Sequence, residues 1–217
     1  MIYCTDTDLL HWEPRLFTEA ASAAQTLISG TADLAGSTLT ISTGSFVAAR
    51  VMPGDVVILT GSVAGTFPIV AVTDALTLSI SVLYDALTPI NDATPAIAPG
   101  AGSALTFAVR SFGAHRRVVS DLLKQLAGII PGTSDDERIT ILNPEALKRP
   151  CVLGTLHLVF SALAAFATEP ASLVVHADQY ERLFRRAIRS THLELDLNGD
   201  GVADCRRALD TIVFKRA

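Results

Sequence analysis

Charged and aromatic side chains are scarce in this chain of 217 residues: 18% are Asp, Glu, Lys or Arg and 6% are Phe, Trp or Tyr. Low charge combined with 49% hydrophobic residues excludes a disordered chain. The chain has only three cysteines, Cys4, Cys151 and Cys205, an odd number at wide spacing. This count argues for a reducing compartment and against a secreted, disulfide-stapled fold, and we expect each cysteine to be a small buried residue. The first residues contain acids and no basic segment, so we expect neither a signal nor a transit peptide.

Positive charge is nearly absent from the first half of the sequence. Residues 1–28 carry one Lys or Arg against four Asp or Glu, and residues 29–103 carry one against five. Residues 104–217 carry fifteen against thirteen, so the three regions have net charges of −3, −4 and +2 and give the total of −5. The middle region is rich instead in Thr, Ser, Val, Ile, Gly and Pro, which is typical of strands and turns.

The middle region therefore predicts short strands at about ten-residue spacing, separated by turn-forming residues. The expected strands are Thr38 to Ser42, Val56 to Thr60, Phe67 to Val72 and Leu76 to Val82. This spacing favours a small antiparallel barrel or sandwich. Residues 86–104 contain three prolines and are predicted to form a linker that returns to the rest of the protein.

The flanking regions favour helices. The first begins at Thr5 or Asp6, and Pro14 predicts a kink or two short helices. Later segments predict a strand at 105–110, helices over 114–130, 151–167 and 175–189, and a hairpin of 192–197 with 208–215. The uncharged run from Cys151 to Ala167 is shorter than the roughly 20 residues of a membrane span, so we expect a core or subunit-packing helix.

The predicted fold class is thus α+β. A helical bundle domain, made of residues 1–28 and 105–217 and ending in the hairpin, carries an inserted small antiparallel β module at 29–104.

One local motif resembles a calcium loop. Asp196, Asn198 and Asp200 match the oxygen-ligand positions of the pattern D-x-[DN]-x-[DN]-G, with Gly201 at the sixth position and the acidic Asp204 at the ninth. The twelfth position, normally a bidentate Glu, is Arg207, and the flanks are predicted strands. The alternative interpretation is a hairpin turn in which the glycines supply positive φ angles and the acids are solvated.

No catalytic motif is present in the sequence. The five histidines lack zinc-site spacing, and neither a P-loop, a G-x-S-x-G nor a G-x-G-x-x-G pattern occurs. We therefore predict a protein that is not an enzyme and that needs no cofactor. In the competing enzyme interpretation, His157 or His176 would be the base.

Basic residues cluster on one predicted helix and near the C-terminus. Positions 182, 185, 186 and 189 share a helix face. Since the chain is acidic overall, this stripe favours an acidic protein surface, or local pairing with Glu181 and Asp178, over nucleic acid. The candidate partner-interface residues are Arg182, Arg185, Arg186, Arg189, Arg206, Arg207, Phe214, Lys215 and Arg216.

Four segments together resemble the head-to-tail connector (adaptor) proteins of tailed bacteriophages and related gene-transfer particles. They are the opening Tyr3-Cys-Thr5-x-x-Asp8-Leu9, the strand and helix TFAVRSF and HRRVVSDLLKQLAGI, the helix pair LNPEALKRPCVLGTLHLVFSAL, and the ending LELDLNGDGVADCRRALDTIVFKR. The resemblance covers about residues 1–28 and 105–217, and the inserted β module departs from the minimal helical adaptor.

This resemblance implies a structural virion protein at the head-tail junction, assembled in the host cytoplasm. About twelve copies would form a homo-oligomeric ring under the portal protein, extend the DNA channel and dock the next neck or tail component. By analogy, Phe214 to Ala217 and the Arg206-Arg207 strand would contact the portal by adding to a sheet edge. DNA would pass through without specific binding, and no membrane would be involved. The alternative is a calcium-tuned binding module, a β-sandwich on a helical stalk.

Overall fold

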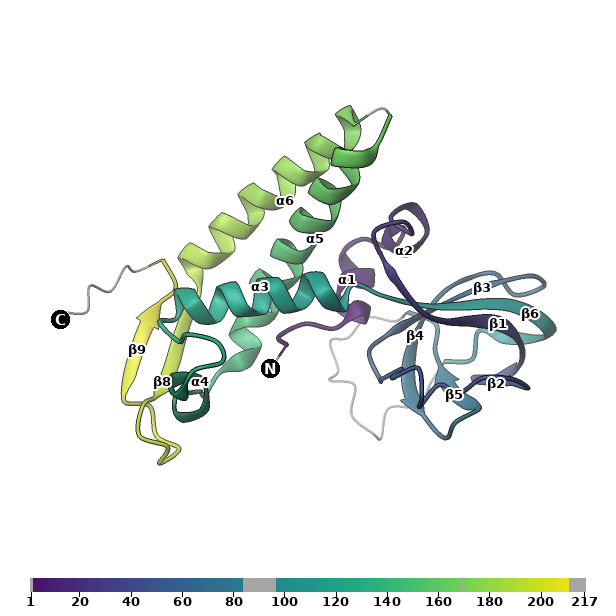
Figure 1. Ribbon diagram of the computed structural model, residues 1–217, viewed down its shortest axis with the longest axis horizontal. Coiled ribbons are helices and arrows are strands. Elements are labelled where there is room, and N and C mark those ends of the chain that lie inside the picture. Colours follow the sequence, from purple (N-terminus) through teal and green to yellow (C-terminus); the bar gives the residue numbers. More distant parts are fainter. Residues whose placement is uncertain (1, 84–96, 169, 211–217) are drawn as a thin grey trace. The chain divides into compact units, whose positions relative to one another are not determined.

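The computed structural model describes residues 2–83, 97–168 and 170–210 (Figure 1). The chain divides into two compact units. We call Thr5–Phe112 the barrel unit, and Met1–Cys4 together with Gly113–Ala217 the helix–sheet unit.

A closed antiparallel barrel of six strands forms most of the barrel unit. The strands are β1 (Gln25–Gly36), β2 (Thr38–Ile41), β3 (Val56–Thr60), β4 (Gly65–Val72), β5 (Thr77–Ile80) and β6 (Gly100–Ser111). Their spatial order is β1-β2-β5-β4-β3-β6, and β6 closes the barrel by pairing with β1 as well as with β3. Closure leaves no open sheet edge in this barrel.

The two longest strands bend to close the barrel. The pairing of β1 with β6 shifts register between Thr26 and Ile28 and again between Ala32 and Leu34. Such bulges increase the local twist, which lets a twelve-residue strand curve around a small core. Inside, Phe46 and Phe107 pack edge to face with ring centroids 5.8 Å apart.

Two short helices precede the barrel and pack on one end of it. Helices α1 (Asp6–Trp12) and α2 (Leu16–Glu19) are separated at Pro14, which confirms the predicted interruption. Thr5 is the N-cap of α1, and its side chain and that of Asp8 form a reciprocal capping box. Thr7 donates from its backbone N–H and its hydroxyl to the carbonyl of Gly54, which joins α1 to the turn before β3.

The predicted helical bundle with a small inserted module is wrong. The barrel is a complete unit rather than a small module at 29–104, since it includes the N-terminal helices and its strands run from Gln25 to Ser111. The strand predicted at 105–110 belongs to β6 in the barrel, and residues 100–104 of the predicted linker are part of that same strand. Residues 84–96 lie outside the described part of the chain.

The helix–sheet unit combines helices with a small antiparallel sheet. Its elements are α3 (Gly113–Leu126), α4 (Ser134–Arg138), β7 (Thr140–Ile141), a 3-10 helix η1 (Pro144–Leu147), α5 (Lys148–Phe166), α6 (Ala171–Ser190), β8 (His192–Asp196) and β9 (Cys205–Ala208). Helices α5 and α6 pack as an antiparallel hairpin, in which Phe160 stacks on Tyr180 with centroids 5.6 Å apart (Figure 1).

Pro144 begins the 3-10 helix η1, and Asn143 before it makes no side-chain capping bond to that helix. The Asn143 amide Nδ2 donates to the carbonyl of His192 at 3.0 Å, and its Oδ1 accepts from the backbone N–H of Glu194 at 2.9 Å. Its side chain therefore imitates a strand backbone beside β8. The strand that pairs with β8 is Cys205–Ala208. Residues 211–215 of the predicted second hairpin strand, 208–215, lie outside the described residues.

Helix α5 is the segment with the most membrane-like composition. Within the described residues, Pro144–Phe166 is long and apolar enough to cross a membrane by length and composition alone. Half of its most apolar window is buried in the unit, and residues 150–156 are all buried. This burial is what the core helix of a folded unit shows.

Candidate partner interface

The predicted arginine stripe lies on the outer face of α6. Arg182, Arg185, Arg186 and Arg189 are all exposed, because the opposite face buries Ala177, Tyr180, Phe184 and Ala187. Arg185 forms an ion pair with Glu181 at 2.6 Å, one helical turn away. Arg182 donates to the backbone carbonyl of Asp178 at 3.2 Å. Local pairing therefore engages the first half of the stripe, and Arg186 and Arg189 extend the positive surface toward the end of the helix.

Apolar side chains are exposed where α5 turns into α6. Phe166, the last residue of α5, is 91% exposed, and Val175 in the first turns of α6 is 61% exposed. Val174 beside it is 43% exposed. Because large exposed apolar patches often mark contacts with other molecules, these side chains are candidates for a partner contact. We call these three residues the hairpin tip.

A second apolar surface is a shallow hollow between α3, α5 and α6. It holds about 250 Å³ and is lined largely by carbon atoms, including those of Val118, Leu122, Leu158 and Phe184. Val118 is 59% exposed and Leu122 is 40% exposed. Gly154 also lines it, in a closely packed place where an added Cβ would lie 2.8 Å from Val119 and 2.9 Å from Phe184. We call this feature the α3 hollow.

The terminal sheet presents a strand edge. The order β7-β8-β9 makes β9 an outer strand in the part of the chain that the structure describes. Arg206 on β9 is exposed and remains a candidate contact. Arg207 is half-buried and donates to the carbonyl of Ala127, just beyond the end of α3. Arg207 therefore joins β9 to the end of α3 within its own unit. The other predicted contacts, Phe214, Lys215 and Arg216, lie outside the described residues.

The calcium-like loop is closed by its own hydrogen bonds. The Asp196 carboxylate is 2% exposed and accepts backbone N–H groups of Asn198, Gly199 and Gly201 at 3.1, 2.6 and 2.8 Å. These bonds, that from Gly201 first, lower the pKa of Asp196. Gly199 and Gly201 have φ of 83° and 81°, as the hairpin-turn interpretation expects.

The other two acids of the loop, Asp200 and Asp204, both accept hydrogen bonds from the side-chain amide of Asn198. Asn198 Nδ2 donates to Asp200 at 3.1 Å and to Asp204 at 3.4 Å. Asp204 also accepts the backbone N–H of Leu197 at 2.7 Å. The structure thus brings the four predicted ligand residues into one loop, where a donor group lies between two of the carboxylates. Among all described residues, no cluster of three His, Cys, Asp or Glu side chains is suited to hold a metal ion.

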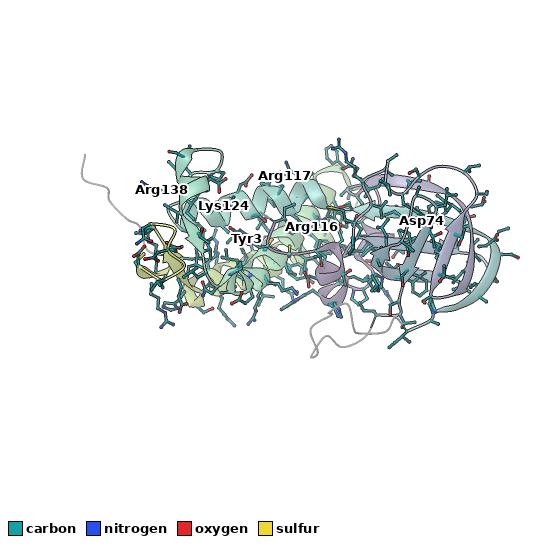
Figure 2. All side chains as sticks on the ribbon, turned by 90° about the horizontal axis from the view of Figure 1, so that it is seen from below. Tyr3, Asp74, Arg116, Arg117, Lys124 and Arg138 are labelled. Atoms are coloured by element: carbon teal, nitrogen blue, oxygen red, sulfur yellow. The ribbon has the colours of Figure 1, made fainter. Side chains whose placement is uncertain are left out.

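An ion pair closes the cavity beside the N-terminal segment. Figure 2 shows Tyr3 alongside α3, near Arg116 and Lys124. Lys124 is 8% exposed and its Nζ lies 2.5 Å from Asp136, whose pKa this bond lowers. Burial raises the pKa of Tyr3 to about 12, so its phenol stays protonated at neutral pH. The Lys124–Asp136 ion pair joins α4 to α3. It lines a cavity of about 170 Å³ together with Tyr3, so this lining includes an uncharged phenol and two paired opposite charges.

The two histidines considered as bases lie between or beside helices. His157 Nδ1 is 3.1 Å from the carbonyl of Ala177 and so links α5 to α6. His176 is exposed and contacts the ring of Phe160, with centroids 5.1 Å apart.

Sequence reasoning missed the hairpin tip and the α3 hollow. Val118 and Leu122 follow the apolar pattern of α3 together with Val119, Leu123 and Leu126, but they are exposed because this stripe is wider than the surface that α5 and α6 cover. An apolar stripe that exceeds the normal width of a core face is the signal that was available. For Phe166, the signal was an aromatic residue directly before a turn.

Comparison of the chain with models of known protein families, with curated proteins and with solved structures gave no match in any of the three.

Proposed function

We propose that this protein is a head-to-tail adaptor, a structural virion protein that forms a ring under the portal and docks the next neck or tail component. The proposal combines the sequence resemblance of the flanking segments with one structural observation. The helix–sheet unit exposes two different apolar surfaces, the hairpin tip and the α3 hollow.

Two different surfaces suit a ring. A closed ring with one subunit type uses a heterologous interface, in which one patch on each copy meets a different patch on its neighbour. The hairpin tip projects an almost fully exposed Phe166, and the α3 hollow offers a carbon-lined recess bordered by Val118 and Leu122. Seating an aromatic side chain in an apolar recess is the usual anchor of a protein interface. In this proposal, the tip of one copy occupies the hollow of the next.

The polar surfaces suit partners above and below the ring. Strand β9 is an outer strand with exposed Arg206, and the chain continues from it to the basic terminus. An outer strand can extend a partner's sheet by main-chain hydrogen bonds. The exposed arginines of α6 suit an acidic surface on the adjoining neck component.

The decisive experiment mixes the purified protein with the portal ring encoded by the same genome and images the product by electron microscopy. The adaptor role predicts an added ring on one face of the portal, with matching symmetry. Absence of added density from a folded protein would overturn the proposal. Deleting residues 212–217 should leave a folded protein that no longer binds the portal, and unchanged binding would remove the terminal contact from it.

A matched pair of variants tests the ring contact. Phe166→Asp should abolish the added ring while leaving the melting temperature unchanged, because the side chain it replaces is 91% exposed. Val47→Asp replaces a 59% exposed apolar residue of the barrel unit and should assemble normally. Equal loss in both variants, or in neither, would contradict the assignment of the hairpin tip.

A further inference from the structure

Two cysteine sulfurs that are far apart in the sequence meet in the interior of the helix–sheet unit. The Sγ atoms of Cys4 and Cys151 are 2.8 Å apart across 147 residues of sequence. Cys4 is 3% exposed and Cys151 is fully buried. The third cysteine, Cys205, lies on β9 and is only half-buried.

Hydrogen bonds from neighbouring residues hold both cysteines in place. Beside Cys4, the backbone N–H of Tyr3 donates to Ser120 Oγ at 3.3 Å, and Arg116 donates to the Cys4 carbonyl at 2.9 Å. On the other side, Cys151 lies in the first turn of α5, 3.5 Å from the same Ser120 hydroxyl. Helix α3 therefore positions both sulfurs, because it carries both Ser120 and Arg116.

The two sulfur atoms need to move only a short distance to form a disulfide bond. A disulfide bond is about 2.05 Å long, so the two sulfurs need to approach by only about 0.8 Å. Hydrogen bonding from Cys4, and then from Ser120, lowers the pKa of the Cys151 thiol, while burial opposes this effect.

We propose that Cys4 and Cys151 are a disulfide-forming pair, which a small-molecule disulfide oxidises to a cross-link between the N-terminal segment and α5. The Cys151 thiolate attacks one sulfur of the oxidant and forms a mixed disulfide, and the first oxidant thiolate leaves. The Cys4 thiol gives up its proton to solvent and its sulfur attacks Cys151, which expels the second oxidant thiolate. Two protein thiols are oxidised and one disulfide is reduced to two thiols.

Access to the buried sulfurs requires the N-terminal segment to open. Residues 2–4 precede the first helix and are held to α3 by the bonds of Tyr3 and Cys4 with Ser120 and Arg116, so exposure of the sulfurs requires these bonds to break in a local opening. Opening of this segment would expose the Cys4 thiol and remove the sulfur that lies against Cys151. Oxidation should therefore be slow compared with that of an exposed thiol, and reclosing of the segment should favour the intramolecular bond over a lasting mixed disulfide.

The cross-link would stabilise the helix–sheet unit against unfolding. Joining residues 4 and 151 closes a long loop in the unfolded chain, which lowers the entropy of that state. We expect the melting temperature of the oxidised protein to rise by about 5–10 °C. The inference rests on contacts inside one unit and stands independently of the adaptor role.

The test uses the full chain with Cys205→Ser, which removes the competing thiol. The protein is incubated with oxidised glutathione, the remaining thiols are alkylated under denaturing conditions, and the unreduced protein is digested with trypsin. We expect the peptide 1–15 to be linked to the peptide 149–182, since trypsin cleaves after Arg15, Lys148 and Arg182 but not between Arg149 and Pro150. Reduction should separate the two peptides and reverse the rise in melting temperature.

A second variant keeps the result interpretable. Cys4→Ser in the same background should show neither the linked peptide nor the thermal shift under identical oxidation. Recovery of both Cys4 and Cys151 as alkylated thiols from the folded, oxidant-treated protein would overturn the proposal. A thermal shift of equal size in the Cys4→Ser variant would overturn it as well, because the stabilisation would then not come from this bond.

Discussion

At the residue scale, one buried carboxylate fixes the N-terminal helix to the barrel. Asp6 is fully buried and accepts hydrogen bonds from Ser111 Oγ at 2.6 Å and from the backbone N–H of Phe112 at 3.0 Å. Phe112 in turn packs edge to face against Phe17 of α2, with centroids 5.1 Å apart. Asp6 therefore satisfies donors at the end of β6 that would otherwise be buried without partners.

Replacing Asp6 should destabilise the barrel unit. Asp6→Ala leaves two buried donors unsatisfied, so we expect a loss of about 2–4 kcal/mol in the free energy of unfolding. Asp6→Asn keeps one acceptor oxygen and should lose less. Chemical denaturation followed by circular dichroism measures both. The control is Asp74→Ala at an exposed turn, and a loss in Asp6→Ala no larger than in this control would refute the assigned role.

The loop at Asp196 gives a second prediction at this scale. Backbone N–H groups already occupy both Asp196 oxygens, and Arg207 at the twelfth position is turned to the end of α3. We therefore expect millimolar calcium to leave the melting temperature unchanged relative to a chelator. A rise that grows with calcium concentration and disappears in Asp204→Asn would instead support the calcium-tuned binding module.

At the element scale, α5 is held by close packing around a glycine. Gly154 lies where α3 and α6 approach α5, and an added Cβ would meet Val119 and Phe184 at less than 3.0 Å. The helix accepts glycine here because the close approach buries Val119, Leu153 and Leu156. The sequence motif LGTL in an otherwise uncharged run is thus explained by packing between helices.

Gly154→Ala should destabilise the helix–sheet unit although alanine favours helix. The gain in helix propensity is about 1 kcal/mol, whereas overpacking a tight core costs about 1–3 kcal/mol. We expect a net loss of up to about 2 kcal/mol, measured by denaturant unfolding. Val119→Ala removes one of the colliding methyl groups, so the double variant should be more stable than the sum of the single effects predicts. Strict additivity would show that the contact is not tight.

Helices and strands were predicted best where residues close in the sequence determine their ends. Pro14 and Pro144 mark helix boundaries that the structure has, and the strands at 38–41, 56–60 and 77–80 fall inside predicted segments. Strand β1 was missed because its two bulges with β6 break the alternation of buried and exposed residues over Gln25–Gly36. When buried and exposed residues do not alternate regularly, a segment rich in Ala, Gly, Ser and Thr is not recognised as a strand and is taken for a helix end followed by a turn.

At the scale of the whole molecule, charge is segregated along the chain. The first 103 residues carry two Lys or Arg against nine Asp or Glu, and the total is −5. The exposed arginines of α6 form a positive stripe, and Glu181 already pairs with one of them. In the proposed adaptor, a channel that lets DNA slide should avoid dense phosphate neutralisation, and the net charge of −5 is compatible with this.

Duplex DNA should accordingly bind very weakly at physiological salt. We expect fluorescence anisotropy with a labelled duplex to show no saturation at micromolar protein, because few phosphates can be neutralised at once. Arg186→Glu with Arg189→Glu should leave this weak signal unchanged. Tight, salt-sensitive binding that these two substitutions abolish would count against the adaptor proposal and turn the α6 stripe into a nucleic-acid site.

The sequence by itself determined the local structure of this protein: the capping box at Thr5, the helix boundaries at prolines, the glycine turns and the poverty of charge in the first half. Only the tertiary structure decided that six strands close a barrel, that the N-terminal helices belong to it, and that Cys4 meets Cys151. The reason is physical. Caps, turns and helix ends depend on residues a few positions apart, whereas barrel closure, burial and exposed apolar surfaces depend on contacts between residues about a hundred positions apart.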